Sequence, residues 1–378
     1  MCGIAKIDWC MEMSDKKKIL ITPHTGLRGL AALCVFITHL GSEQQITLGF
    51  NQRLLWPFYW SDFAVDLFFM LSGFILNWVY VTSPVASLDW GRYLRARCAR
   101  ILPLYYLTLI PFLPPTITTL RLYGLKHDHG LLFAKLLGNL TLLAGFSGPD
   151  RWDWRYNAPS WSISVEFFAY LILMPLLVLL MRKREGRIPY DILCFSGMGA
   201  LLCYANFKHD FFGWNWSQFG RGLFCFPFGF VLCSIFRRYR DQGSAASSPV
   251  SLAALAVMVM ALYGWLPRIL ILCCFPFIVY FSAFNSGIFS RIMNAELLQW
   301  LGERSYSLYL WHTPIMYVWF IPRVAAIDGV LPVSRAWLGV SNMACILLAV
   351  LIVSEFSYRF FEDPLRRLLN KKRTGYLG

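Results

Sequence analysis

Long apolar runs alternate with short polar segments along nearly the whole chain. Ten runs are long enough for an α-helix to cross a bilayer core, and they lie near 27–46, 63–82, 101–120, 160–181, 190–207, 221–236, 249–266, 268–285, 305–322 and 337–358. The run 131–146 is shorter and contains Lys135 and Asn139, so we expect a re-entrant or interfacial helix there. The pattern predicts an all-α, polytopic membrane protein with about ten transmembrane helices.

The basic residues predict how these helices are oriented. With the N-terminus inside, about two-thirds of the 35 Lys and Arg residues fall on inner segments, as the positive-inside rule requires. A full crossing by 131–146 would reverse every later loop and place basic segments outside. We therefore expect cytoplasmic termini. The chain then divides into a cytoplasmic segment 1–22, a transmembrane domain 23–367 and a basic cytoplasmic tail 368–378.

Composition agrees with a membrane protein and excludes other classes. Hydrophobic residues make up 57% of the chain and charged residues 15%, whereas soluble domains carry about 25% charged residues. The net charge of +14 resides in short loops, so topology explains it and no nucleic-acid partner is expected. Most of the 11 Cys residues lie in apolar runs as small hydrophobes, which predicts neither a disulfide framework nor a metal site.

Two ionisable residues interrupt the first apolar run, LRGLAALCVFITHL. Arg28 and His39 are separated by about three helical turns, so both lie on one face, about 16 Å apart along the axis. Ionisable groups at membrane depth are costly and usually face a cavity or each other. A lone His in a helix is often structural, but the shared face with Arg28 favours a site in which His39 transfers a proton.

Further polar residues stand in the second and third runs. Asp66 lies inside the second run, where it serves either a site or a partner helix, and Ser72–Gly73 permits close approach of a ligand or of another backbone. Arg97 and Arg100, three residues apart, share one helical face just before the third run. They fit either a basic inner loop or a clamp for phosphate groups.

The later runs add a carboxylate and a second histidine. Glu166 lies about two turns into the fourth span, where a carboxylate must be neutral, paired or facing a cavity. His312 in the ninth span is expected to be a structural, hydrogen-bonded residue. Arg359, Glu362 and Pro364 are expected to cap the last span at the inner surface.

Five sequence features, in order, resemble the acyltransferase-3 family of integral membrane O-acyltransferases. They are the pair Arg28 and His39 with ten residues between them, and the runs DLFFMLSGF, RARCARILPLYY, SWSISVEFFAY and SYSLYLWHTPI. The resemblance covers about residues 23–367. It implies a ten-helix plan and transfer of an acyl group, most often acetyl, to a hydroxyl of a carbohydrate, as in exopolysaccharide or O-antigen, or of another small molecule. Some members carry an extracytoplasmic hydrolase-like domain, and the stand-alone form is expected here.

The resemblance also implies roles for residues and partners. The donor would be acyl-CoA, with no permanently bound cofactor, and Arg97 and Arg100 would grip its phosphates. Arg28 would orient the donor, and His39 would act as general base or be acylated itself. Glu166 would orient His39. The remaining residues expected in substrate or donor binding are Asp66, Ser72, Gly73 and Trp161.

Other functions compete with this one. The intramembrane His, Glu and Arg residues would equally serve a proton relay in a transporter or flippase of lipid-linked saccharide, although no internal repeat is evident. A structural subunit of a polysaccharide-assembly complex is a third function. Aromatic residues of the outer segments fit either sugar stacking or interface anchoring; they are Trp56, Trp60, Trp152, Trp154, Trp214 and Trp216. In each case the expected location is the bacterial inner membrane.

Overall fold

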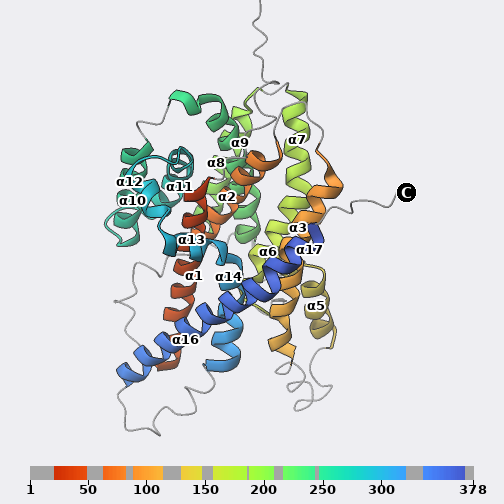
Figure 1. The fold of residues 1–378 in the computed structure, drawn as a ribbon, viewed down its shortest axis with the longest axis vertical. Coiled ribbons are helices and arrows are strands. Elements are labelled where there is room, and N and C mark those ends of the chain that lie inside the picture. The colour runs from red at the N-terminus through yellow and green to blue at the C-terminus, as the bar shows by residue number, and fades with distance from the viewer. Residues whose placement is uncertain are drawn as a thin grey trace, which may run out of the picture.

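The computed structural model describes residues 21–48, 63–81, 88–113, 129–146, 156–184, 187–207, 216–242, 247–320 and 335–370. Every regular element in these ranges is a helix, so the predicted all-α fold is confirmed (Figure 1). A helix stands at each of the ten predicted positions: α1 (Thr22–Leu48), α2 (Phe63–Tyr80), α3 (Trp90–Leu109), α6 (Ser160–Phe168) continued by η6 (Ala169–Leu173) and α7 (Met174–Lys183), α8 (Tyr190–Phe207), α9 (Trp216–Tyr239), α10 (Ser247–Leu262), α11 (Ile269–Ser282), α14 (Ser305–Thr313) continued by η9 (Pro314–Phe320), and α16 (Arg335–Ser357).

Shorter helices connect or extend these elements. They are η2 (Ile110–Phe112), α5 (His129–Leu140), η4 (Ala144–Phe146), η7 (Arg240–Gln242), α12 (Gly287–Met293), α13 (Glu296–Glu303), η10 (Tyr358–Glu362) and α17 (Asp363–Asn370). The predicted short helix at 131–146 corresponds to α5, whose 12 residues span about 18 Å, less than a bilayer core. Three of the helical segments, η6, η9 and η10, are π-helical turns.

Four helical stretches of the described chain are long and apolar enough to cross a membrane: Phe63–Tyr80, Ser160–Lys183, Phe219–Tyr239 and Gly339–Leu369. A fifth forms if α11 and α12, which are bent by 95° at their junction, count as one span. The long helix α1 is not among these stretches, and it carries Arg28 and His39 within its apolar run. The apolar helices thus support a membrane protein, and the number of ten spans stays a prediction.

Glycines bring α2 and α9 into close contact at the centre of the bundle. A methyl group at Gly73 would lie 2.0 Å from the Phe226 carbonyl oxygen, and one at Gly229 would lie 1.9 Å from that of Met70. Small residues permit such approach between membrane helices. The two helices run in the same direction, because Asp66 pairs with Arg221 and Asn77, eleven residues later, donates to the carbonyl of Phe230.

Helix α1 lies beside α14 and is in contact with it (Figure 1). Its first turns pack on α12 and α13, where methyl groups at Gly26 and Gly29 would clash with the backbone of Met293 and Gly302. Helices α1 and α14 run in the same direction, since Arg28 contacts Ser305 and His39 contacts His312. Ionisable residues of α1 therefore meet polar residues of α14 at two successive levels.

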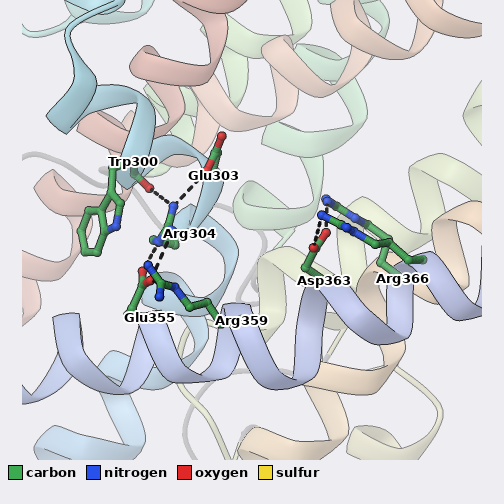
Figure 2. A network of polar contacts seen from close by, with 8 residues as sticks. Trp300, Glu303, Arg304, Glu355, Arg359, Asp363 and Arg366 are labelled. Atoms are coloured by element: carbon green, nitrogen blue, oxygen red, sulfur yellow. Dashed lines mark hydrogen bonds and ion pairs between the residues drawn. The ribbon is translucent and has the colours of Figure 1, made fainter.

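An ionic cluster fastens the start of α14 to α16, as Figure 2 shows. The buried Arg304 forms ion pairs with Glu303 and Glu355, and its Nη1 donates to the carbonyl of Trp300 at 3.2 Å. Arg359 also pairs with Glu355. Helix α16 continues through η10 and α17 as far as Asn370, the last residue that the structure describes, so the predicted cap at Glu362 and Pro364 is wrong.

Some predicted features lie outside the residues that the structure describes. Most of the segment 1–22 and the tail from residue 371 lie outside the described residues, as do five of the six outer tryptophans: Trp56, Trp60, Trp152, Trp154 and Trp214. Trp216 begins α9, and its side chain is likewise outside the description.

Candidate acyl-transfer site

A pocket lies where α1, α2, α3, α6 and α14 converge. Four residues predicted for the site line it, each from a different helix: Arg28, Ser72, Arg100 and Glu166. The remainder of the wall is mainly apolar and aromatic, from Val65, Phe68, Phe69, Ile101, Ser162, Ile163, Ser305, Tyr306 and Tyr309. The pocket thus combines two guanidinium groups and a carboxylate with an apolar wall, as small-molecule sites commonly do.

Glu166 is held by two hydroxyl donors. Ser72 Oγ donates to its Oε1 at 2.8 Å, and the Tyr170 hydroxyl, one turn later on the same helix, donates to the same oxygen. Tyr170 belongs to the π-helical turn η6, and such turns often occur at functional sites. The carboxylate therefore has a fixed position in the pocket wall. Its hydrogen bonds are with Ser72 and Tyr170, whereas the sequence interpretation paired it with His39.

The guanidinium of Arg28 faces charges from three other helices. Its Nη2 donates to Ser305 Oγ at 3.3 Å, and it lies within electrostatic reach of Arg100, Glu166 and Glu362. Arg100 forms no hydrogen bond or ion pair with the residues that the structure describes. Neighbouring cations repel each other, so an anion between Arg28 and Arg100 would be stabilised.

Sequence reasoning missed Glu362 as a site residue. Only 5% of this side chain is exposed, and it accepts a hydrogen bond of 2.7 Å from Ser307 Oγ. The π-helical turn η10 lies just before α17 and ends at Glu362. A π-helical turn changes the helical phase, so a 3.6-residue period read from the sequence could not show that Glu362 points inward.

Arg97 lies beside the pocket among aromatic rings. Its Nη2 donates to the Tyr80 hydroxyl at 3.3 Å, and its Cζ is 5.5 Å and 5.6 Å from the ring centroids of Tyr80 and Tyr170. Within the described ranges no carboxylate pairs with Arg97, and its buried Nε has no hydrogen-bond partner. Cation–π contacts of this kind stabilise a guanidinium and leave N–H groups for an anion.

His39 meets a second histidine rather than a carboxylate. Its Nδ1 lies 2.8 Å from Nε2 of His312, and the two ring planes are within 17° of each other with centroids 5.1 Å apart, so the rings meet edge to edge. His39 is half-buried and His312 is fully buried. Tyr309, one turn before His312, lines the pocket and packs its ring edge against His312. The histidine pair therefore lies one turn beyond the pocket wall.

A proline explains the local structure that carries His312. Pro314 has no N–H, so the carbonyl of Leu310, four residues earlier, lacks its helical donor. The buried Asn157 side chain supplies the donor instead, with Nδ2 3.0 Å from that oxygen. Buried carbonyl groups need a partner. Asn157 and Pro314 together connect the segment before α6 to the helix that bears His312.

The remaining predicted residues lie beside the pocket and not in its wall. Asp66 forms a bidentate ion pair with Arg221 of α9, at 2.7 Å and 2.8 Å. Trp161 packs on Phe69, with Cζ of Arg221 5.9 Å from its ring centroid. Gly73 contacts the backbone of α9. These three residues hold α2, α6 and α9 together around the pocket.

Residues 25–359 match the family model of the acyltransferase domain of the acyltransferase-3 family. The chain is 29% identical to the acyltransferase MdmB of Streptomyces mycarofaciens, over 92% of both chains. It is 22% identical to the peptidoglycan O-acetyltransferase OatA of Listeria monocytogenes, where the match covers 90% of this chain and 55% of that protein. No solved structure matches the chain. The helical bundle, its polar pocket and the match over nearly the whole chain lead to one conclusion: this chain is an acyltransferase and belongs to the acyltransferase-3 family.

Proposed function

We propose that this membrane acyltransferase moves an acyl group, acetyl in the simplest case, from acyl-CoA to a hydroxyl of a carbohydrate or glycolipid. The observation that carries the proposal is the pocket in which Arg28 and Arg100 face Glu166 and an apolar wall. A glycan acceptor is supported by OatA, whose name describes O-acetylation of peptidoglycan. The inner membrane of a bacterium is the proposed location, with ten spans and both termini cytoplasmic.

The arginines of α3 are proposed to bind the donor. In the proposed orientation the start of α3 faces the cytoplasm, where acyl-CoA resides. Its phosphate groups require cations, and guanidinium groups match phosphate oxygens. Arg97 and Arg100 have no carboxylate partner in the described part of the chain. Both therefore suit the donor phosphates, with Arg28 deeper in the pocket to orient the acyl group.

His39 is proposed to act as the general base. It takes the proton of the acceptor hydroxyl while that oxygen forms a bond with the thioester carbonyl carbon. The carbon–sulfur bond then breaks, and the leaving CoA thiolate takes the proton back from the imidazolium. Glu166, fixed by Ser72 and Tyr170, balances the positive charge of Arg28 during these steps. The route from Arg28 to His39 follows one face of α1.

A donor-binding experiment tests this proposal. Membranes containing the protein are incubated with labelled acetyl-CoA and cell-derived glycan, and transferred label is measured against donor concentration. Replacing Arg97 and Arg100 with Gln should raise the KM for acetyl-CoA at least tenfold. The matched control replaces Arg92 and Arg95, which are exposed on the same helix, and should leave KM within about twofold of wild type. Equal KM values in the two double variants would contradict the phosphate clamp.

A further inference from the structure

The histidine pair His39 and His312 raises the question of which nitrogen carries a proton. In two neutral imidazoles, one ring nitrogen donates and the other accepts. The 2.8 Å bond joins Nδ1 of His39 to Nε2 of His312. Either His39 donates through Nδ1 and keeps its lone pair on Nε2, or His312 donates and the protons are reversed.

The surroundings of His312 favour the first arrangement. The carbonyl groups of Leu308 and Tyr309, in the preceding turn, interact with its ring. Nδ1 of His312 is buried and has no hydrogen-bond partner of good geometry within the described residues. A proton on Nδ1 would face those carbonyl dipoles favourably, whereas a bare lone pair there would be repelled by them. Nε2 of His312 is then the acceptor, and Nδ1 of His39 is the donor.

His312 is enclosed too closely to handle a substrate proton itself. None of its side chain is exposed, and the edges of Phe36 and Tyr309 pack against it with ring centroids 5.9 Å away. His39 is half-buried, and its ring meets that of His312 edge to edge through the 2.8 Å hydrogen bond, with the two ring planes within 17° of each other. Of the two imidazoles, only His39 has the exposure that contact with an acceptor hydroxyl requires.

We infer that His312 is a positioning residue: it accepts the Nδ1 proton of His39 and thereby holds His39 in the tautomer whose Nε2 lone pair takes the acceptor's proton. This inference rests on the proposed role of His39 as general base. A ring nitrogen's hydrogen bond commonly sets which tautomer is present and how the ring is oriented. His312 does here, from α14, what a carboxylate does for a catalytic histidine in other enzymes.

Three variants of His312 separate positioning from packing. His312→Phe and His312→Leu fill the space without an acceptor, whereas His312→Gln supplies an acceptor oxygen. We expect kcat to fall about 100-fold or more in the Phe and Leu variants, with the KM for acetyl-CoA within about twofold of wild type. The kcat of His312→Gln should be at least tenfold higher than that of the Phe and Leu variants. Membrane content and thermal midpoint are measured for every variant, and rates are expressed per folded protein.

The outcomes distinguish this inference from the proposed function. Absence of acetyl transfer by wild type, or equal transfer by wild type and His39→Ala, contradicts the proposed function. If wild type transfers acetyl and His39→Ala does not, the function stands and His312 is tested alone. Turnover of His312→Phe or His312→Leu within about threefold of wild type would overturn the inference. Equal impairment of the Gln, Phe and Leu variants would do so too, because packing alone would then explain it.

Discussion

Asp66 and Arg221 face each other between α2 and α9 with 3% and 11% of their side chains exposed. Removing one partner of a buried ion pair leaves an uncompensated charge, which costs about 3–5 kcal/mol. We predict that Asp66→Ala lowers the free energy of unfolding by about that amount, measured from thermal unfolding in detergent. The exposed pair Arg184 and Asp191 is the matched control, and Asp191→Ala should cost less than about 1 kcal/mol. Similar losses in both variants would contradict the buried pair.

The sequence identified some site residues by the cost of placing charge in an apolar helix. Arg28 and Glu166 are predicted on that ground and Arg100 from its three-residue spacing from Arg97, and the structure brings all three to one pocket. The sequence did not predict the contact of His39 with His312, because the two residues are 273 positions apart and their helices meet only in the folded chain. The sequence also did not predict that Glu362 lies near Arg28, because the π-helical turn η10, which ends at Glu362, changes the helical phase.

Gly73 and Gly229 set the distance between α2 and α9. A methyl group at either position would lie within 2.0 Å of a backbone carbonyl oxygen, which no side-chain rotation relieves. We predict that Gly73→Ala and Gly229→Ala each destabilise the protein by about 1–3 kcal/mol. Gly91→Ala is the control, since the nearest atom would be 3.5 Å away. Unchanged thermal midpoints for the first two variants would contradict this packing.

Asn157 and Pro314 form one unit where α14 ends and η9 begins. Asn157→Ala leaves the buried carbonyl of Leu310 without a donor, and we predict a loss of about 1–3 kcal/mol. Pro314→Ala restores an N–H that can reach this carbonyl. In the Pro314→Ala background, Asn157→Ala should therefore cost at least 1 kcal/mol less, as a double-mutant cycle of thermal unfolding would report. Additive costs would show that the two residues act separately.

The helices were the part of the fold that the sequence predicted best. Each of the ten apolar runs contains a helix, because a backbone in lipid must satisfy its own polar groups. The helix that follows the predicted span 268–285 was not predicted: α12 continues the chain from α11 at an angle of 95°. Side chains that decide such a bend contact other helices, and a hydropathy pattern does not record those contacts.

The orientation of the whole molecule gives a further prediction. If both termini are cytoplasmic and α5 does not cross, a reporter fused after Lys183 or after Gln242 should report a cytoplasmic position. A reporter fused after Leu113 should report an external one. These fusions test the charge bias that places basic loops inside. An external reporter after Lys183 would mean that α5 crosses the bilayer and that the ten-span plan is wrong.

The central claim is that His39 performs proton transfer between acyl-CoA and an acceptor hydroxyl. The most direct measurement compares label transfer from acetyl-CoA to cell-derived glycan by wild type, His39→Ala and His24→Ala, at equal amounts of membrane protein. His24 is also on α1, but it is buried and hydrogen-bonded to the carbonyl of Val279. We predict that His39→Ala loses transfer at least 100-fold and that His24→Ala retains most of it per folded protein. Equal transfer by wild type and His39→Ala would contradict the claim.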